Sequence, residues 1–163
     1  MGKAALRLVP GPTAVGPAFV ALVAVLAQAF TGVARAAPIK AEQRCLAEAM
    51  YWEARGEGRR GMIAVGWTVL NRMKSPRFPS TACGVVHQGG ERPPCEFAYW
   101  CDGRSDEPRE LRSWRSALGI AHELLHDPPR DPTHGALYFH NRSVRTPHHR
   151  VRTARIGAHV FYR

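Results

Sequence analysis

The chain has 163 residues, of which 45% are hydrophobic and 22% are charged, and its formal net charge is +10. This composition excludes a disordered chain and suits a single globular domain of ordinary size. The positive charge favours an anionic partner. However, the arginines are scattered and no nucleic-acid-binding motif is present, so nucleic acid is not the expected partner.

The N-terminus has the order of a cleavable secretory signal. Lys3 and Arg7 precede an uncharged run over 18–30, and the small-residue triplet 34–36 follows. The run is shorter than the roughly 20 residues that cross a bilayer core, so we expect cleavage rather than a membrane anchor. The mature protein is expected to be periplasmic or secreted, monomeric and not integral to the membrane. The predicted organisation is a signal peptide over 1–36, a lead-in over 37–44 and one domain over 45–163.

The first predicted helix covers 42–55, where apolar residues recur at helical spacing. Glu53 follows Leu46 by seven positions and Met50 by three, which places its carboxyl on the apolar face. Burial and the negative end of the helix dipole both raise the pKa of such a carboxyl. A protonated carboxyl is what a general acid in glycoside cleavage needs. The alternative is a glutamate that only pairs with a nearby arginine, such as Arg55, Arg59 or Arg60.

A second helix is predicted over 60–74, where Gly66 allows close packing and Ser75-Pro76 ends the pattern. The stretch 77–108 is rich in Pro and Gly and is predicted as a long loop region, a feature that is often functional in compact domains.

Four cysteines indicate an oxidising compartment, where disulfides persist. Sequence alone leaves their pairing open. Closeness along the chain favours Cys95 with Cys101, which leaves Cys45 with Cys83. A zinc site is the alternative, but none of the spacings is the Cys-x-x-Cys knuckle.

A third helix is predicted over 110–126, and it contains the pattern His122-Glu123-Leu124-Leu125-His126. Two histidines at this spacing bind zinc in metallopeptidases, with the glutamate as general base. A zinc-dependent peptidase or amidase is therefore an alternative hypothesis. It lacks an evident third ligand, because no glutamate follows Glu123 and only a later histidine could complete the site. We expect no metal and no other cofactor.

The pattern changes to short, aromatic and β-branched segments at 136–140 and 158–162, which predict strands. The expected fold class is α+β, mainly helical with a small terminal β-sheet.

Several ordered segments resemble the SleB-like cell wall hydrolases. The opening motif lies in Cys45–Glu57, and further likeness is found in 61–74, 95–103, 135–141 and 153–162. Two residues depart from the family pattern: Glu96 stands where the family usually carries Gln, and Ala98 where it often carries Ser.

The resemblance implies a lysozyme-like and lytic-transglycosylase-like catalytic domain that cleaves the MurNAc–GlcNAc strand of peptidoglycan, with Glu53 as general acid and base. A transglycosylase needs no second carboxylate, whereas hydrolysis would need a partner such as Glu57, Glu96, Asp102 or Asp106. A non-catalytic wall-binding module is a further alternative. Aromatic and polar groups near the site are candidates for substrate binding, although aromatics in a small domain are often core. The candidates are Glu57, Phe97, Tyr99, Tyr138 and His140.

Overall fold

The computed structural model describes residues 39–144 and 149–163. The predicted signal peptide lies outside these residues. All described residues belong to one compact unit. No helix within the described ranges is long and apolar enough to cross a membrane.

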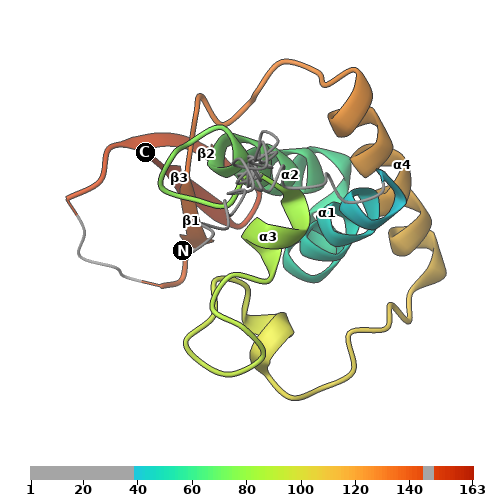
Figure 1. Ribbon diagram of the computed structural model, residues 1–163. Helices are drawn as coiled ribbons and strands as arrows, with labels where there is room; N and C mark the ends of the chain where they lie inside the picture. Colours follow the sequence, from blue (N-terminus) through green and yellow to red (C-terminus); the bar gives the residue numbers. More distant parts are fainter. Residues whose placement is uncertain (1–38, 145–148) are drawn as a thin grey trace, which may run out of the picture. The chain divides into compact units, whose positions relative to one another are not determined.

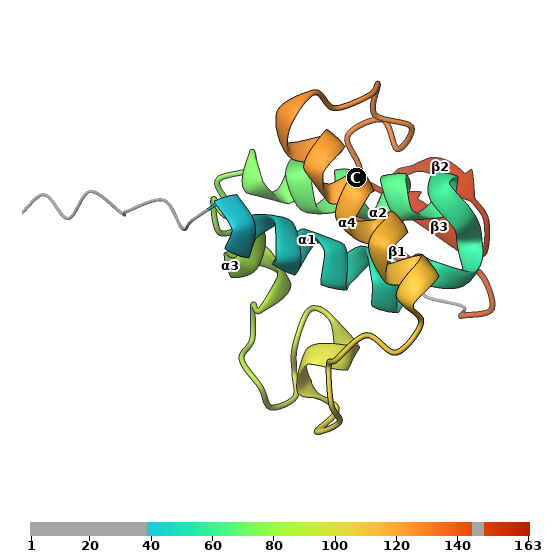
Figure 2. The same cartoon turned by 90° about the vertical axis from the view of Figure 1, so that its right-hand side faces the viewer.

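Three helices build most of the core: α1 (Ile39–Ala54), α2 (Gly58–Met73) and α4 (Leu111–His126). Helix α1 packs against both of the others, as Figures 1 and 2 show. The three predicted helices are confirmed, although α1 begins within the predicted lead-in. Leu46 and Met50, on the predicted apolar stripe, are fully buried. Gly66 lets α2 approach closely, because a Cβ there would collide with Met50 and Leu124.

The predicted loop region contains two short helices that the sequence did not reveal, α3 (Ala82–Val86) and η2 (Ala98–Cys101). The hydroxyl of Thr81 caps α3 by accepting a hydrogen bond from the Gly84 amide at 3.1 Å. Both favoured disulfides are present: Cys45–Cys83 ties α1 to α3, and Cys95–Cys101 closes the segment that carries η2.

The terminal sheet has three antiparallel strands in the order β1-β3-β2. They are β1 (Tyr138–Asn141), β2 (Arg152–Ile156) and β3 (His159–Tyr162). Aromatic and β-branched composition had predicted β1 and β3. Strand β2, whose two arginines are exposed, lay only within the segment 153–162 that resembled the family's closing strands. Phe161 and Ile156 pack with Ala64 of α2 in a second, smaller core. The sheet is thereby fixed against the helices, and the predicted α+β class is confirmed.

The short helix η1 (Arg55–Glu57) joins α1 to α2. It places Glu57 against the turn between β2 and β3, where the Glu57 carboxylate accepts a hydrogen bond from the Ala158 amide at 2.8 Å. Gly157 in that turn has a φ of +57°, and a Cβ there would collide with the Glu57 carboxylate. The turn therefore needs glycine both for its left-handed backbone and for space.

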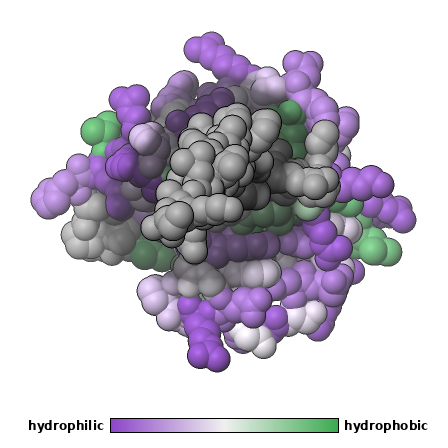
Figure 3. Space-filling view, in the orientation of Figure 1, coloured by the Kyte–Doolittle hydropathy of each residue, from purple (hydrophilic) through white to green (hydrophobic). Residues whose placement is uncertain are grey.

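The molecular face in Figure 3 is mainly hydrophilic. Large apolar side chains that are exposed among the described residues are Leu111, Val144 and Val151, and they lie on separate segments. Scattered apolar residues of this kind are ordinary and do not mark a docking face.

Candidate active site

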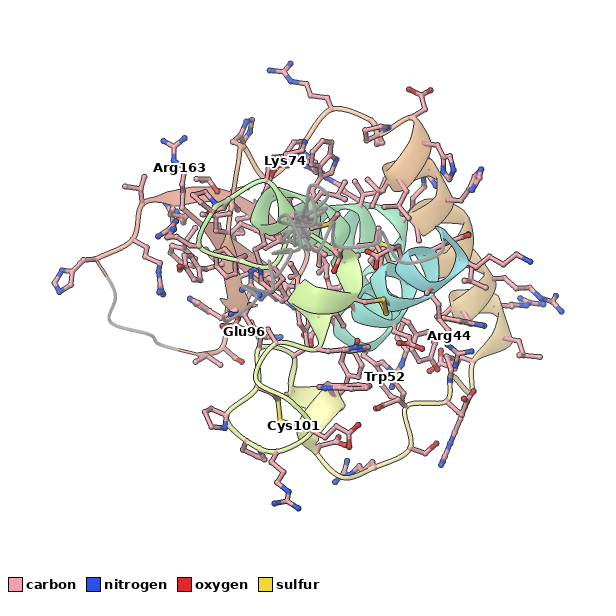
Figure 4. All side chains as sticks on the ribbon, in the orientation of Figure 1. Arg44, Trp52, Lys74, Glu96, Cys101 and Arg163 are labelled. Carbon is pink, nitrogen blue, oxygen red and sulfur yellow. A yellow bond between two sulfur atoms is a disulfide. The ribbon has the colours of Figure 1, made fainter. Side chains whose placement is uncertain are left out.

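A cavity of about 460 Å³ lies between the end of α1, helix α2, the start of η2 and the sheet. Glu53 lines it from α1 and Arg72 from α2, while Glu96 and Ala98 line it from the segment closed by the Cys95–Cys101 disulfide. The sheet supplies the facing residues, which include Tyr138, Phe139, His140 and His159. Figure 4 labels Glu96 on the segment that leads into η2. Elements far apart in the sequence thus meet around one carboxyl.

Glu53 is half-buried in the last turn of α1 and makes no hydrogen bond or ion pair with any described residue. Burial raises the pKa of its carboxyl. The nearby arginines are engaged elsewhere: Arg55 pairs with Glu110 at 3.0 Å, and Arg59 pairs with Glu123. The alternative in which Glu53 is only the partner of one of these two arginines therefore does not hold.

Glu57 was expected near the substrate, but it is not among the residues that line the Glu53 cavity. Its carboxylate is held by the Ala158 amide and faces the β2–β3 turn. Helix α1 ends at Ala54 and Glu57 belongs to η1, so the direction of Glu57 could not be read from the periodicity of α1.

Glu96 is the second carboxylate of the cavity, and it is ion-paired with Arg72 at 2.9 Å. Arg72 is buried, donates its Nε–H to the Leu137 carbonyl at 2.7 Å and contacts the Tyr138 ring. Burial lowers the pKa of Arg72, and the negative charge of Glu96 raises it again in part. Of the four possible partner carboxylates, Glu96 is therefore the one that shares the cavity with Glu53. Asp102 and Asp106 line a neighbouring cavity of about 390 Å³.

Of the four rings predicted to bind substrate, two line the Glu53 cavity and two do not. Tyr138 and His140 of β1 line the Glu53 cavity. Phe97 is buried in the core, as the alternative reading held. Tyr99 is also buried, stacks on Trp52 with ring centroids 5.9 Å apart, and lines the neighbouring cavity. Burial raises the pKa of the Tyr99 hydroxyl, so it stays protonated.

No pattern in the sequence indicated that Arg72 or His159 would face the site. Arg72 lies in a predicted helix, where an arginine is expected at the surface. His159 lies in a short aromatic strand. Their positions depend on how α2 and β3 pack around the cavity. Alternation in β3 does place His159 and Phe161 on one face, but it does not show which face is the cavity wall.

The zinc alternative receives no support from α4. His122 and His126 are exposed, and Glu123 pairs with Arg59. The grouping of three ligand side chains found among the described residues is Cys45, Glu48 and His87, and its cysteine is bound in a disulfide. Neither arrangement offers the three free ligands of a catalytic zinc site.

Comparison with known proteins places the chain in a family. Residues 56–162 match the family described as Cell Wall Hydrolase. The spore cortex-lytic enzyme of Bacillus subtilis (strain 168) is 35% identical over 124 residues, which cover 72% of this chain and 36% of that protein. The chain thus spans about a third of the length of that curated relative.

Two solved structures are also similar. The catalytic domain of the Bacillus cereus SleB protein has a TM-score of 0.59 and 29% identity over 76% of this chain and 91% of that one. The catalytic domain of the germination-specific lytic transglycosylase SleB from Bacillus anthracis has a TM-score of 0.58 and 32% identity, covering 75% and 93%. The family match begins just after Glu53, and the sheet and cavity wall fall within it. The chain belongs to the Cell Wall Hydrolase family.

Proposed function

We propose that the chain is an exported enzyme that cleaves the glycan strand of peptidoglycan as a lytic transglycosylase, with Glu53 as its general acid and base. The observation that carries the proposal is a half-buried carboxyl, unpaired among the described residues, that faces a cavity of about 460 Å³ and has a raised pKa. An acid in this state can protonate a glycosidic oxygen near neutral pH. The similar Bacillus anthracis protein is a lytic transglycosylase, which supports the reaction type.

Glu53 performs two proton transfers in this mechanism. Its carboxyl first donates a proton to the oxygen between MurNAc and GlcNAc as the C1–O bond of MurNAc breaks. The resulting carboxylate then removes the proton from the muramoyl 6-hydroxyl, whose oxygen forms the new bond to C1. The products are a free GlcNAc 4-hydroxyl and a 1,6-anhydro ring, and the carboxyl regains its proton. No water is consumed, so one carboxyl is sufficient.

The state of Glu96 supports transglycosylation over hydrolysis. A hydrolase would need a second carboxylate that activates water or attacks C1. Glu96 shares the cavity, but its carboxylate is held in an ion pair with the buried Arg72. We assign Glu96 to binding and shaping the cavity and not to proton transfer.

Digestion of purified sacculi tests this proposal. Wild-type protein should release fragments that end in 1,6-anhydro rings, which mass spectrometry identifies because each is lighter by one water than a reducing end. Reducing ends in their place would mean hydrolysis and would require a role for Glu96, which Glu96→Gln would then test. Release of peptides without glycan cleavage would contradict the proposal and favour a peptidase or amidase. Binding to sacculi without any soluble product would favour the wall-binding module.

Export is part of the proposal, and it rests on the signal-like order of residues 1–36 and on the two disulfides. Intact-mass and N-terminal analysis of protein recovered outside the cytoplasm should give a chain that starts near Ala37. Retention of Met1 in that material would contradict signal cleavage.

A further inference from the structure

His159 is a buried polar side chain in the wall of the Glu53 cavity. It begins the central strand β3, lies opposite Asn141 of β1 and Ile156 of β2, and is 6% exposed. Its Nδ1 is buried and has no hydrogen-bond partner among the described residues. A buried polar group without a partner is uncommon, because it loses its hydration without compensation. The other ring nitrogen, Nε2, also has no hydrogen-bond partner among the described residues, but it is not among the fully buried atoms, so it is the nitrogen that a ligand in the cavity could reach.

The surroundings of His159 fix its protonation state. Burial is the main cause that lowers the pKa of the imidazole; the charge of Glu57 raises it, and His140 lowers it. Other charged groups of the cavity are Glu53, Arg72, Glu96 and Arg150. The ring is therefore neutral near pH 7 and carries one proton. A buried N–H without an acceptor is the costlier state, so the proton belongs on Nε2 and the unpaired Nδ1 holds a lone pair.

Aromatic rings lie beside the single N–H donor of His159. The ring of Phe139 meets the imidazole edge-on at 5.3 Å between centroids, and Phe139 itself lines the cavity. Phe161 packs behind Phe139 at 5.8 Å between centroids. The neutral N–H can donate to a carbonyl oxygen, and the aromatic ring can pack against a methyl group. Together they are complementary to a ligand group that has both. An acetamido group has both, whereas an ammonium group can neither accept the hydrogen bond nor pack as an apolar methyl.

We propose that His159 and Phe139 form a subsite for the N-acetyl group of an amino sugar, with the Nε2–H of His159 donating to the acetamido oxygen and Phe139 contacting the methyl. The cavity then selects N-acetylated glycan over de-N-acetylated glycan. This inference rests on the proposed function, because it takes the occupant of the cavity to be a peptidoglycan strand. It makes His159 a residue that determines specificity, in the same cavity as Glu53 but without a role in proton transfer.

A matched pair of variants tests the role of the Nε2 donor. In Glu53→Gln protein, where binding can be measured without cleavage, a GlcNAc–MurNAc tetrasaccharide should bind about tenfold more tightly than its N-deacetylated counterpart. Adding His159→Gln, whose side-chain amide reaches the position of Nε2, should keep this preference. Adding His159→Asn, whose shorter amide reaches only the position of Nδ1, should abolish it. Equal preferences in both variants, or no preference in the Glu53→Gln protein, would overturn the inference.

A spectroscopic measurement covers the case in which the His159 variants do not fold. In the Glu53→Gln protein, the NMR signals of the His159 imidazole should identify the Nε2–H tautomer, and the Nε2 resonance should shift on adding the N-acetylated tetrasaccharide but not the deacetylated one. A proton on Nδ1, or equal shifts with both sugars, would contradict the subsite. Failure of the proposed function is separate: wild-type protein would then cleave no glycan, whatever the binding measurements show.

Discussion

Two glutamates four positions apart, Glu53 at the end of α1 and Glu57 in η1, have opposite surroundings. Glu57 accepts a backbone hydrogen bond from Ala158 and holds the β2–β3 turn. Glu53 has no partner among the described residues and faces a cavity. The same side chain therefore stabilises a turn in one place and is the proposed reactive group in the other. The difference indicates that an unsatisfied carboxyl, rather than a merely buried one, marks the site.

The largest expected difference between the two glutamates is in activity. Glu53→Gln keeps the shape of the side chain but cannot transfer a proton, so glycan cleavage should fall on the order of a hundred- to ten-thousand-fold. Glu57→Gln should reduce the rate by about tenfold or less, because its amide oxygen can still accept the Ala158 hydrogen bond. Release of soluble fragments from sacculi measures both rates. A Glu53→Gln rate within a few-fold of wild type would exclude Glu53 as the general acid.

Stability should separate the glutamates in the other direction. Glu57→Ala leaves the Ala158 amide without its acceptor and should lower the free energy of unfolding by about 1–3 kcal/mol. Urea unfolding followed by circular dichroism measures this change. Glu110→Ala, which removes a carboxylate from an exposed ion pair with Arg55, is a suitable control and should change stability by less than about 1 kcal/mol. If Glu57→Ala and Glu110→Ala lowered the free energy of unfolding equally, the Glu57–Ala158 hydrogen bond would not stabilise the β2–β3 turn.

Glu53→Gln should stabilise the protein at neutral pH by about 0.5–2 kcal/mol, because a neutral amide replaces a carboxyl whose charged form is disfavoured by burial. The pKa of Glu53 is raised above its ordinary value of 4.5 by burial. Its contribution to stability is therefore present below pH 4.5 and is lost as the pH rises through the folded-state pKa. The gain from Glu53→Gln should shrink as the pH is lowered to 4. A gain that is independent of pH would contradict this origin.

His159 should show the opposite pH dependence, with the smallest effect. Burial lowers its pKa below the ordinary 6.5, so the folded protein resists protonation and stability falls as the pH drops from 6.5 through the folded-state pKa. The glutamine introduced by His159→Gln cannot be protonated. The stability of this variant minus that of wild type should therefore be greater at pH 5 than at pH 8, by less than about 1 kcal/mol. Thermal unfolding at both pH values tests this. An unchanged difference would mean that His159 is not held neutral.

The helices and the half-buried position of Glu53 could be predicted from the sequence because both depend on local periodicity. Leu46, Met50 and Glu53 share one face of a single helix, and no distant contact is needed to see it. The rest of the site depends on packing between elements. Arg72 reaches Glu96 across 24 positions of sequence, and Phe97 turns into the core while Tyr99 turns toward a second cavity. Composition did not predict strand β2, because its exposed arginines are neither aromatic nor β-branched.

The sheet order β1-β3-β2 has a consequence for the time at which the site forms. Strand β3 comes after both of its neighbours in the sequence, so neither can pair until it is available. If the chain crosses a membrane from its N-terminus onward, the helices and Glu53 emerge first, and the wall that carries His159 emerges last. A chain arrested partway would present the acid without the cavity. Vectorial emergence would thus leave the proposed active site incomplete until delivery of the chain is nearly finished.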